Sequence, residues 1–381
     1  ARRALPLHVR LKFLYILIGL RQSLVNDIAM KNTKKTKPLI GITMGDPYGI
    51  GPEIILRSLK SPNIRRLAHY VIIGSKNVFE WTTGTLNIPL RYQIISHLSE
   101  AEASECPVSL LPLGDVESYL PGQKKVTIEG GDMSVQCILR GINLAMSGHI
   151  DALVTAPICK EAIHAAGYGY PGHTEILKTF SGGKRVVMLM AGGKLRVAFV
   201  TTHVALREVP QLITIEDVFE TITITNDNLK RFFGLEKPRI AVCGLNPHAG
   251  EEGIFGSEEK KIITPAIEMA QENGVQCIGP VSADTIFFKA MKGGHDAVVA
   301  IYHDQGAIPL KLHAFETGVN ITLGIPFART SPDHGTAYDI AGKGVADPRS
   351  MMEAIKTAVR MAGCIRSGEV NYEYRTRNFE L

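Results

Sequence analysis

The chain contains a series of short apolar runs, each ending in a glycine, proline, histidine, asparagine or aspartate and followed by a helical pattern. Runs that are apolar at every position are typical of strands buried on both faces, as in parallel sheets covered by helices. The seven runs lie in PLIGITMGDPYGIGPEII, HYVIIGS, DALVTAPICKEA, KLRVAFVTTHVALR, PRIAVCGLNPHAGEEG, DAVVAIYHDQGAIPLK and VNITLGIPFARTSPDHGT. This rhythm predicts an α/β fold, in which ligands bind beyond the carboxyl ends of the strands.

Other elements follow from local patterns. The segment VVMLMAGGKLRVAFV places two apolar runs around Gly192-Gly193, which predicts a β-hairpin. Helices are expected at 213–233, 258–273 and 348–363. A chain of 381 residues exceeds one average domain. Because no linker or repeat interrupts it, we expect two interleaved α/β lobes.

The net charge of +5 comes mostly from the first residues of the chain. Residues 1–29 hold five Arg or Lys and one acid, so the remainder carries 37 basic and 36 acidic residues, a net of +1. This balance gives the body of the chain no electrostatic reason to bind nucleic acid or an anionic membrane.

The N-terminal segment contains the apolar stretch LKFLYILIGL. Ten residues are about half of the ~20 that a helix needs to cross a bilayer, and no small-residue cleavage site follows. We expect residues 1–29 to be an upstream extension ahead of Met30, with a targeting segment as the alternative. Six scattered cysteines without a C-x-x-C pair favour reduced thiols and a cytoplasmic protein.

Three histidines occupy equivalent places. His203, His248 and His303 each lie just beyond a predicted strand, and Asp284 follows a fourth. If these strands share a sheet edge, the imidazoles can converge on a divalent metal, zinc by ligand type. The spacing matches no short metal motif. A metal-free site, with one histidine as general base and the others as hydrogen-bond donors, remains the alternative.

Other segments suggest anion binding or close backbone approach. The stretch MGDPYGIGPE is neither a dinucleotide fingerprint nor a phosphate loop, and it indicates only that backbone must approach something closely. His173 and Thr174 lie at a loop-to-helix junction, where an anion or a simple helix cap would fit. Lys311, Asn320 and Arg329 are further candidate anion-binding residues.

In combination these motifs resemble the 4-hydroxythreonine-4-phosphate dehydrogenase (PdxA) family of vitamin B6 biosynthesis, from about Pro38 to Gly363. The resemblance rests on GITMGDPYGIGPEI, GHTEIL, TTHVALR, CGLNPHAGEEG, ADTIF, YHDQGAIPLK and GVNITLGIPFARTSPDHGTAYDIAGKG. GDPYGIGPE and HGTAYDIAGKG are also similar to the wider class that includes isopropylmalate dehydrogenase. Tyr48 departs from the family, which more often has alanine there.

The resemblance implies a two-lobed α/β/α fold with the active site in the cleft between the lobes. It implies one lobe from 38–166 plus 304–370 and a second, 167–303, that carries the dimer interface. Residues 1–37 and 371–381 would lie outside both lobes.

The resemblance also implies roles for the site residues. The metal ligands would be His203, His248 and His303, with His303 supplied by the partner in a homodimer. Substrate would be bound by His173, Thr174, Lys311, Asn320 and Arg329. Lys311 or Asp284 would relay the proton. His334 and Asp339 would contact the cofactor.

The implied activity is oxidation of 4-phosphooxy-L-threonine to 2-amino-3-oxo-4-phosphooxybutanoate, which decarboxylates to 3-amino-2-oxopropyl phosphate. The cofactors would be NAD or NADP and a divalent metal, zinc, magnesium or cobalt. One alternative is a paralogue that oxidises 4-phospho-D-threonate or 4-phospho-D-erythronate. Another branch of the family oxidises aromatic cis-dihydrodiols, which carry no phosphate. The candidate anion-binding residues disfavour this branch. From a different class, a metal-dependent hydrolase of a phosphorylated metabolite would leave HGTAYDIAGKG without a role.

Overall fold

The computed structural model describes residues 37–117, 119 and 126–367. The chain divides into two compact units. The first comprises the described residues up to Phe180 together with Gly335–Ala346, and the second comprises Ser181–His334 and the described residues from Asp347 onward. The expected N-terminal extension, 1–29, and the expected tail, 371–381, lie outside the described residues.

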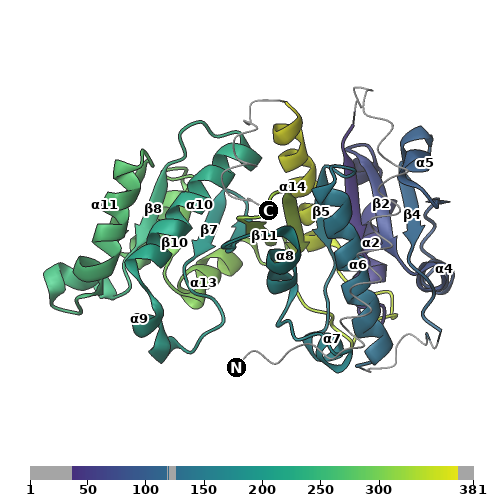
Figure 1. Ribbon diagram of the computed structural model, residues 1–381, viewed down its shortest axis with the longest axis horizontal. Helices are drawn as coiled ribbons and strands as arrows, with labels where there is room; N and C mark the ends of the chain where they lie inside the picture. Colours follow the sequence, from purple (N-terminus) through teal and green to yellow (C-terminus); the bar gives the residue numbers. More distant parts are fainter. Residues whose placement is uncertain (1–36, 118, 120–125, 368–381) are drawn as a thin grey trace. The chain divides into compact units, whose positions relative to one another are not determined.

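The first unit is a parallel sheet flanked by helices (Figure 1). Its strands follow the order β3-β4-β2-β1-β5, and every residue of β1 is buried, as a strand covered on both faces requires. The strands are β1 (Leu39–Thr43), β2 (His69–Gly74), β3 (Gln93–Ile94), β4 (Val108–Pro112) and β5 (Ala152–Thr155). The helices are α2 (Gly51–Lys60), α3 (Pro62–Arg65), α4 (Lys76–Thr85), α5 (Leu98–Ala103), α6 (Ile128–Met146), α7 (Lys160–Ala165) and α8 (His173–Ser181).

The second unit has a mixed sheet in the order β12-β11-β6-β7-β10-β8-β9. The pairs among β7, β10, β8 and β9 are parallel, whereas those among β12, β11, β6 and β7 are antiparallel. The strands are β6 (Val187–Gly192), β7 (Leu195–Phe199), β8 (Ile240–Cys243), β9 (Cys277–Val281), β10 (Ala297–Ala300), β11 (Val319–Leu323) and β12 (Ala328–Pro332). The hairpin expected around Gly192-Gly193 is confirmed by β6 and β7.

The antiparallel pair β11 and β12 departs from the sequence prediction, in which VNITLGIPFARTSPDHGT was a single run in a parallel sheet. Only 324–327 separate the two strands, and a connection this short can form a hairpin but not the crossover that parallel strands need.

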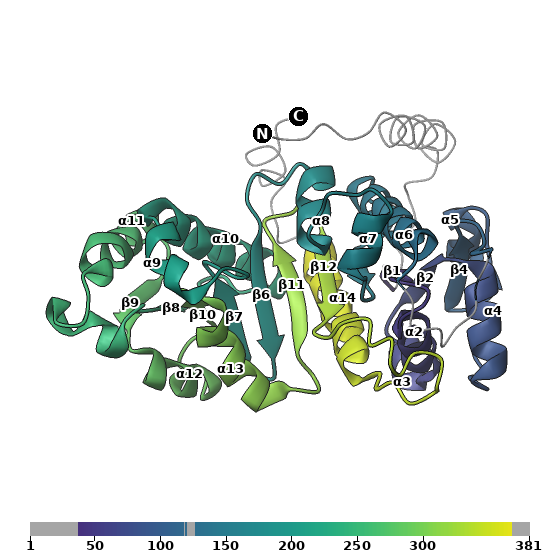
Figure 2. The ribbon, with the colours of Figure 1, turned by 90° about the horizontal axis from the view of Figure 1, so that it is seen from below.

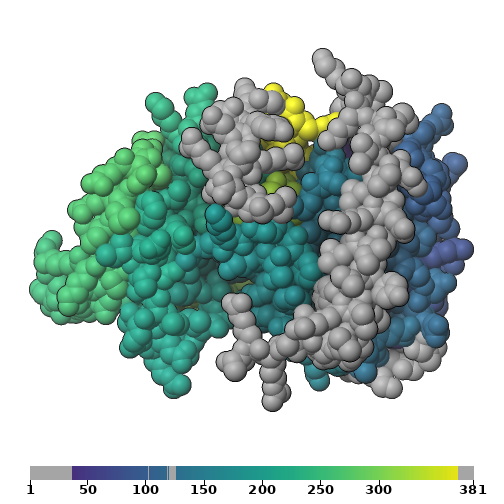
Figure 3. All heavy atoms as spheres, in the orientation of Figure 1, coloured from purple at the N-terminus to yellow at the C-terminus, as the bar shows by residue number. Residues whose placement is uncertain are grey.

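Helices cover both faces of this sheet. In Figure 2, α10 (Ile215–Phe233) and α11 (Thr264–Glu272) lie on one face, and α12 (Ala283–Met291) and α13 (His303–Ala314) lie on the other. The remaining helices are α9 (Val209–Leu212) and α14 (Arg349–Arg366), with shorter helical turns at Leu206–Glu208, Pro247–Gly253 and Glu259–Ile263. Side chains fill the spaces between the ribbons, as the teal and green spheres show (Figure 3). The three helices predicted from sequence are confirmed.

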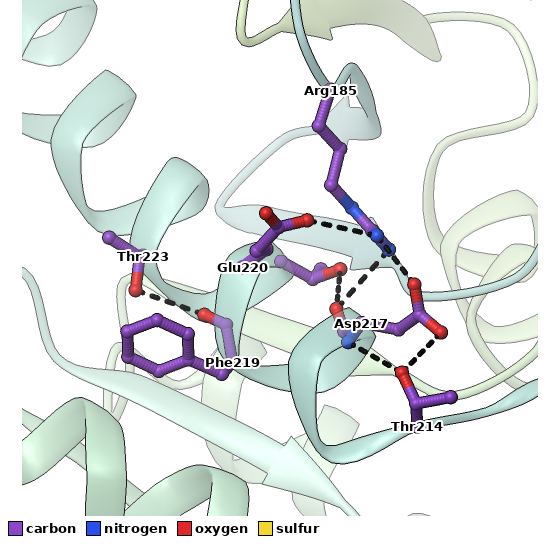
Figure 4. A network of polar contacts seen from close by, with 7 residues as sticks. Arg185, Thr214, Asp217, Phe219, Glu220 and Thr223 are labelled. Atoms are coloured by element: carbon purple, nitrogen blue, oxygen red, sulfur yellow. Dashed lines mark hydrogen bonds and ion pairs between the residues drawn. The ribbon is translucent and has the colours of Figure 1, made fainter. Parts of the chain in front are cut away.

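A polar network fixes the start of α10 against the strand that follows Arg185 (Figure 4). Thr214 caps the helix by accepting from the Asp217 N–H at 3.0 Å, and Arg185 pairs with Asp217 at 2.5 Å and with Glu220 at 3.0 Å. Burial alone would raise the pKa of Asp217, but the hydrogen bonds from Thr214 and Arg185 outweigh it and lower that pKa. The ionised carboxylate therefore stabilises this corner of the second unit.

The division into units differs from the predicted lobes, which placed 304–370 with 38–166. Helix α13 packs on β6, β7 and β10, and α14 packs on β11, β12 and α10, so both helices belong to the second unit. In this part of the chain only Gly335–Ala346 joins the first unit.

Among the described helices, none combines the length and apolar character that a bilayer crossing needs. All six cysteines lie within the described residues and are free thiols, as the sequence predicted.

Candidate active site

The candidate metal ligands lie at one edge of the second unit's sheet. Strands β7, β10, β8 and β9 are parallel neighbours, so their carboxyl ends face the same way. His203, His303, His248 and Asp284 follow these four strands in that order across the sheet. The prediction that the three histidines lie just beyond strand ends is confirmed.

Two of the histidines are neighbours. The ring centroids of His203 and His303 are 5.9 Å apart, and their planes are inclined by 34°. Both line a pocket of about 240 Å³, together with Thr202, Val204, Leu206, Val209, Tyr302 and Asp304. This separation suits two imidazoles that bind the same metal ion.

The orientation of His303 suits metal binding. Its Nδ1 lies 2.7 Å from Asp304 Oδ1, which favours the tautomer with the proton on Nδ1 and a lone pair on Nε2. Gln305, next in sequence, serves the fold. It accepts from the Ile301 N–H at 2.7 Å and donates to the Gly244 carbonyl at 2.7 Å, which ties β10 to β8.

Among the described residues, His248 does not complete a metal-binding group with this pair. Its ring contacts Phe255 at 6.3 Å between centroids, and the backbone from His248 to Glu252 is left-handed throughout. The buried carboxylate of Glu259 holds this loop by accepting from the Asn246 backbone at 2.7 Å and its side chain at 3.0 Å. Within the described part of the chain, no three His, Cys, Asp or Glu side chains form a group that could hold a metal. The donor chemistry of His203 and His303 fits a divalent metal.

A buried cation lies on the β11/β12 hairpin. Arg329 is 2% exposed, donates to Thr322 Oγ1 at 2.9 Å, and has its pKa lowered by burial to about 9. Asn320 pairs across the hairpin with Ser331, and residues two apart share a face of a strand. Asn320 and Arg329 therefore lie on one face, opposite the face where Thr330 donates to the Ala354 carbonyl of α14. A buried guanidinium beside an amide is suited to a phosphate or carboxylate.

Two more candidates have defined partners. Lys311, on α13, forms an ion pair with Asp333 at 3.3 Å between Nζ and Oδ2. Asp284, in the first turn of α12, accepts from Ser282 Oγ at 2.6 Å and is exposed.

The remaining candidates divide between the units. His173 and Thr174 begin α8 of the first unit, which confirms the predicted loop-to-helix junction. Asp339 lies in the first unit and is exposed within the segment Gly335–Ala346, where its carboxylate can accept hydrogen bonds from a ribose. His334 lies in the second unit.

Three carboxylates near the candidates were not predicted from sequence. Asp304 was recognisable by its position beside His303. Asp333 and Asp46 pair with Lys311 and Tyr338, residues far away in sequence for which spacing gives no signal.

Comparison with known proteins identifies the family. Residues 66–358 match the family described as "Pyridoxal phosphate biosynthetic protein PdxA". A 4-hydroxythreonine-4-phosphate dehydrogenase from Geobacter metallireducens is 47% identical over 336 residues, which cover 87% of this chain and 98% of that protein. A D-threonate 4-phosphate dehydrogenase from Salmonella typhimurium is 45% identical over 328 residues, 85% and 98% of the two chains.

Solved structures agree. The 4-hydroxythreonine-4-phosphate dehydrogenase from Klebsiella pneumoniae is 41% identical with a TM-score of 0.80, covering 87% of this chain and 99% of that one. A terephthalate 1,2-cis-dihydrodiol dehydrogenase from Burkholderia xenovorans is 27% identical with a TM-score of 0.61, covering 85% and 98%. These relatives are oxidoreductases, which removes the hydrolase alternative. This chain belongs to the PdxA family and is an oxidoreductase.

Proposed function

We propose that the chain oxidises 4-phosphooxy-L-threonine at C3, with NAD or NADP as hydride acceptor and a divalent metal. The observation that carries the proposal is the pair His203 and His303, with Asp304 on His303 Nδ1. When bound, the metal would polarise the substrate alcohol and the nicotinamide would accept the hydride. The oxidised product is a β-keto acid, which loses CO2 readily.

The chain's own residues would bind and orient the substrate. Arg329 and Asn320, on one face of the β11/β12 hairpin, would hold an anionic group of the substrate. His173 and Thr174 would bind a second polar group at the start of α8. Lys311, held by Asp333, or Asp284 would relay the alcohol proton, and His334 and Asp339 would contact the cofactor.

We propose a homodimer with a shared site, and a different subunit assignment from the sequence prediction. His203 and His303 are neighbours within one chain, which supports both as ligands from the same subunit. Among the described residues, His248 completes no metal-binding group with them, which favours His248, rather than His303, as the partner's ligand.

A second candidate substrate is 4-phospho-D-threonate, because several relatives of 42% to 45% identity are named for that activity. It would use the same anion-binding residues, since it differs from the first substrate near C2 and keeps the phosphate.

The test is NADH formation by the full chain with each substrate, with and without EDTA, followed by addition of Zn²⁺. His203→Ala should lose turnover, whereas His164→Ala, an exposed histidine on α7, should retain it. Chelator-sensitive oxidation of 4-phosphooxy-L-threonine alone supports the proposal. Oxidation of the threonate alone selects the second candidate, and nicotinamide reduction with neither substrate contradicts both.

A further inference from the structure

The segment Gly335–Ala346 belongs to the first unit, although the residues on both sides of it belong to the second. It leaves after β12 and returns before α14. The segment contains Asp339, so under the proposed function it is the cofactor segment, and this name is used below. What holds it in the first unit is the glycine-rich stretch 44–53, whose role the sequence left open.

The first contact joins the backbone of this stretch to the backbone of the cofactor segment. The Ile50 N–H donates to the Thr336 carbonyl at 2.9 Å. A Cβ added at Gly49 would lie 3.0 Å from that oxygen and 3.1 Å from Thr336 Cβ. Glycine at position 49 therefore permits the close approach that the sequence predicted, and the approached group is the cofactor segment.

The second contact is a partly buried side-chain pair. The Tyr338 hydroxyl donates to Asp46 Oδ2 at 2.7 Å, and the other carboxylate oxygen accepts from the Tyr48 N–H at 2.9 Å. Asp46 is 1% exposed, and burial raises its pKa although both hydrogen bonds lower it. Burial, followed by the charge of Asp46, raises the pKa of Tyr338, so its hydroxyl keeps the proton that it donates.

The third contact is at the C-terminal end of the cofactor segment. Glu53, 2% exposed in the first turn of α2, accepts from the N–H groups of Gly344 at 3.3 Å and Ala346 at 3.0 Å. Arg57, one turn later, pairs with Glu53 at 3.2 Å and donates to the Gly344 carbonyl. The Glu53 carboxylate is thus paired with a cation and accepts hydrogen bonds from the segment, as a buried charge requires.

These contacts fix residues 336, 338, 344 and 346 of the segment. Residues 339–343 form a turn between the fixed residues, with Asp339 and Lys343 exposed. We infer that Asp46 and Glu53 are positioning residues for the nicotinamide cofactor: they set the shape of the cofactor segment before the cofactor binds. The inference rests on the proposed function. A segment ordered in advance binds more tightly because less conformational freedom is lost on binding.

The test uses two variants that each remove one tyrosine hydroxyl from the first unit, partly buried at Tyr338 and buried at Tyr70. Tyr338→Phe breaks the hydrogen bond to Asp46. The control is Tyr70→Phe, in β2, which breaks the 2.6 Å hydrogen bond from the Tyr70 hydroxyl to the Ile64 carbonyl. NAD⁺ affinity is measured by calorimetry on the full chain without substrate. Amide hydrogen exchange of 335–346 is followed in the absence of cofactor. Tyr338→Phe should weaken NAD⁺ binding about 10-fold, the size expected for the loss of one hydrogen bond to a charged group, and should speed exchange in the segment. Tyr70→Phe should change neither.

A further variant, Glu53→Gln, keeps the side chain's size and should act in the same direction as Tyr338→Phe. In both variants KM for NAD⁺ should rise while kcat at saturating NAD⁺ is retained. Unchanged NAD⁺ affinity in folded Tyr338→Phe overturns the inference, as does equal weakening by Tyr70→Phe, which would indicate general destabilisation. If the wild-type chain binds neither NAD⁺ nor NADP⁺, the proposed cofactor fails and the inference fails with it.

Discussion

Lys311 Nζ and Asp333 Oδ2 form an ion pair at 3.3 Å, which joins α13 to the residue that follows β12. Asp333 is itself fixed, because its backbone N–H donates to Ser350 Oγ at 3.1 Å, and that hydroxyl donates to the Gly318 carbonyl at 2.8 Å. The flexible lysine side chain is therefore held at its charged end. A group that accepts or donates a proton during catalysis requires such positioning.

Asp333→Asn should lower kcat about 10- to 100-fold, the cost of misplacing a proton-transfer group by about 1 Å, with KM for NAD⁺ unchanged. The fold should persist because the bond to Ser350 uses the Asp333 backbone. Steady-state kinetics test this, with Asp347→Asn as control, since Asp347 pairs with Arg349 in an exposed position. Partial recovery in Asp333→Glu is expected, and full activity in Asp333→Asn would contradict the role.

Arg329→Met should leave the ligand-free protein as stable as the wild type or more so, and should abolish stabilisation by inorganic phosphate. Burial lowers the pKa of Arg329 to about 9, so the buried charge opposes folding at neutral pH. This cost should fall as the pH rises above about 9, because the folded state then releases a proton that the unfolded state keeps. Melting temperatures with and without phosphate test the prediction.

The control for Arg329 is Arg231→Met. Arg231 is also buried, but its guanidinium donates to the Pro326 carbonyl at 2.5 Å and lies 4.9 Å from the Phe232 ring centre. Its loss should lower the melting temperature and leave the phosphate response intact. A phosphate response that survives in Arg329→Met would show that the anion binds elsewhere.

Sequence patterns predicted where strands and helices lie better than which strands and side chains contact one another. Polar residues at the ends of apolar runs located His203 and His303 because strand ends are local features of the sequence. The antiparallel pairing of β11 with β12 was not predicted, since the residues of a strand do not reveal the direction of the strand beside it. The bond between Asp46 and Tyr338 spans 292 positions, and no local pattern encodes a contact at that separation.

Asp304→Asn should weaken metal binding about 10- to 100-fold, the usual effect of removing the carboxylate that orients a ligating histidine. The 2.7 Å contact between Asp304 Oδ1 and His303 Nδ1 favours the tautomer that leaves Nε2 for the metal. Competition with a chromophoric chelator measures the affinity. Glu316→Gln, which removes an exposed carboxylate just beyond α13, should change nothing. Equal affinity in both variants would exclude this role for Asp304.

Mixing inactive variants tests which histidine crosses the subunit boundary. If His203 and His303 act from one subunit and His248 from the other, a heterodimer of His248→Ala and His303→Ala has one intact site. A 1:1 mixture should then recover about a quarter of wild-type activity, because half of the dimers are mixed and each has one of two sites intact. A mixture of His203→Ala and His303→Ala should recover none, since each subunit lacks one member of the pair. Activity is measured after subunit exchange has been verified with differently tagged chains. Recovery in the second mixture would return the crossing role to His203 or His303, and recovery in neither would argue for a site built from one chain.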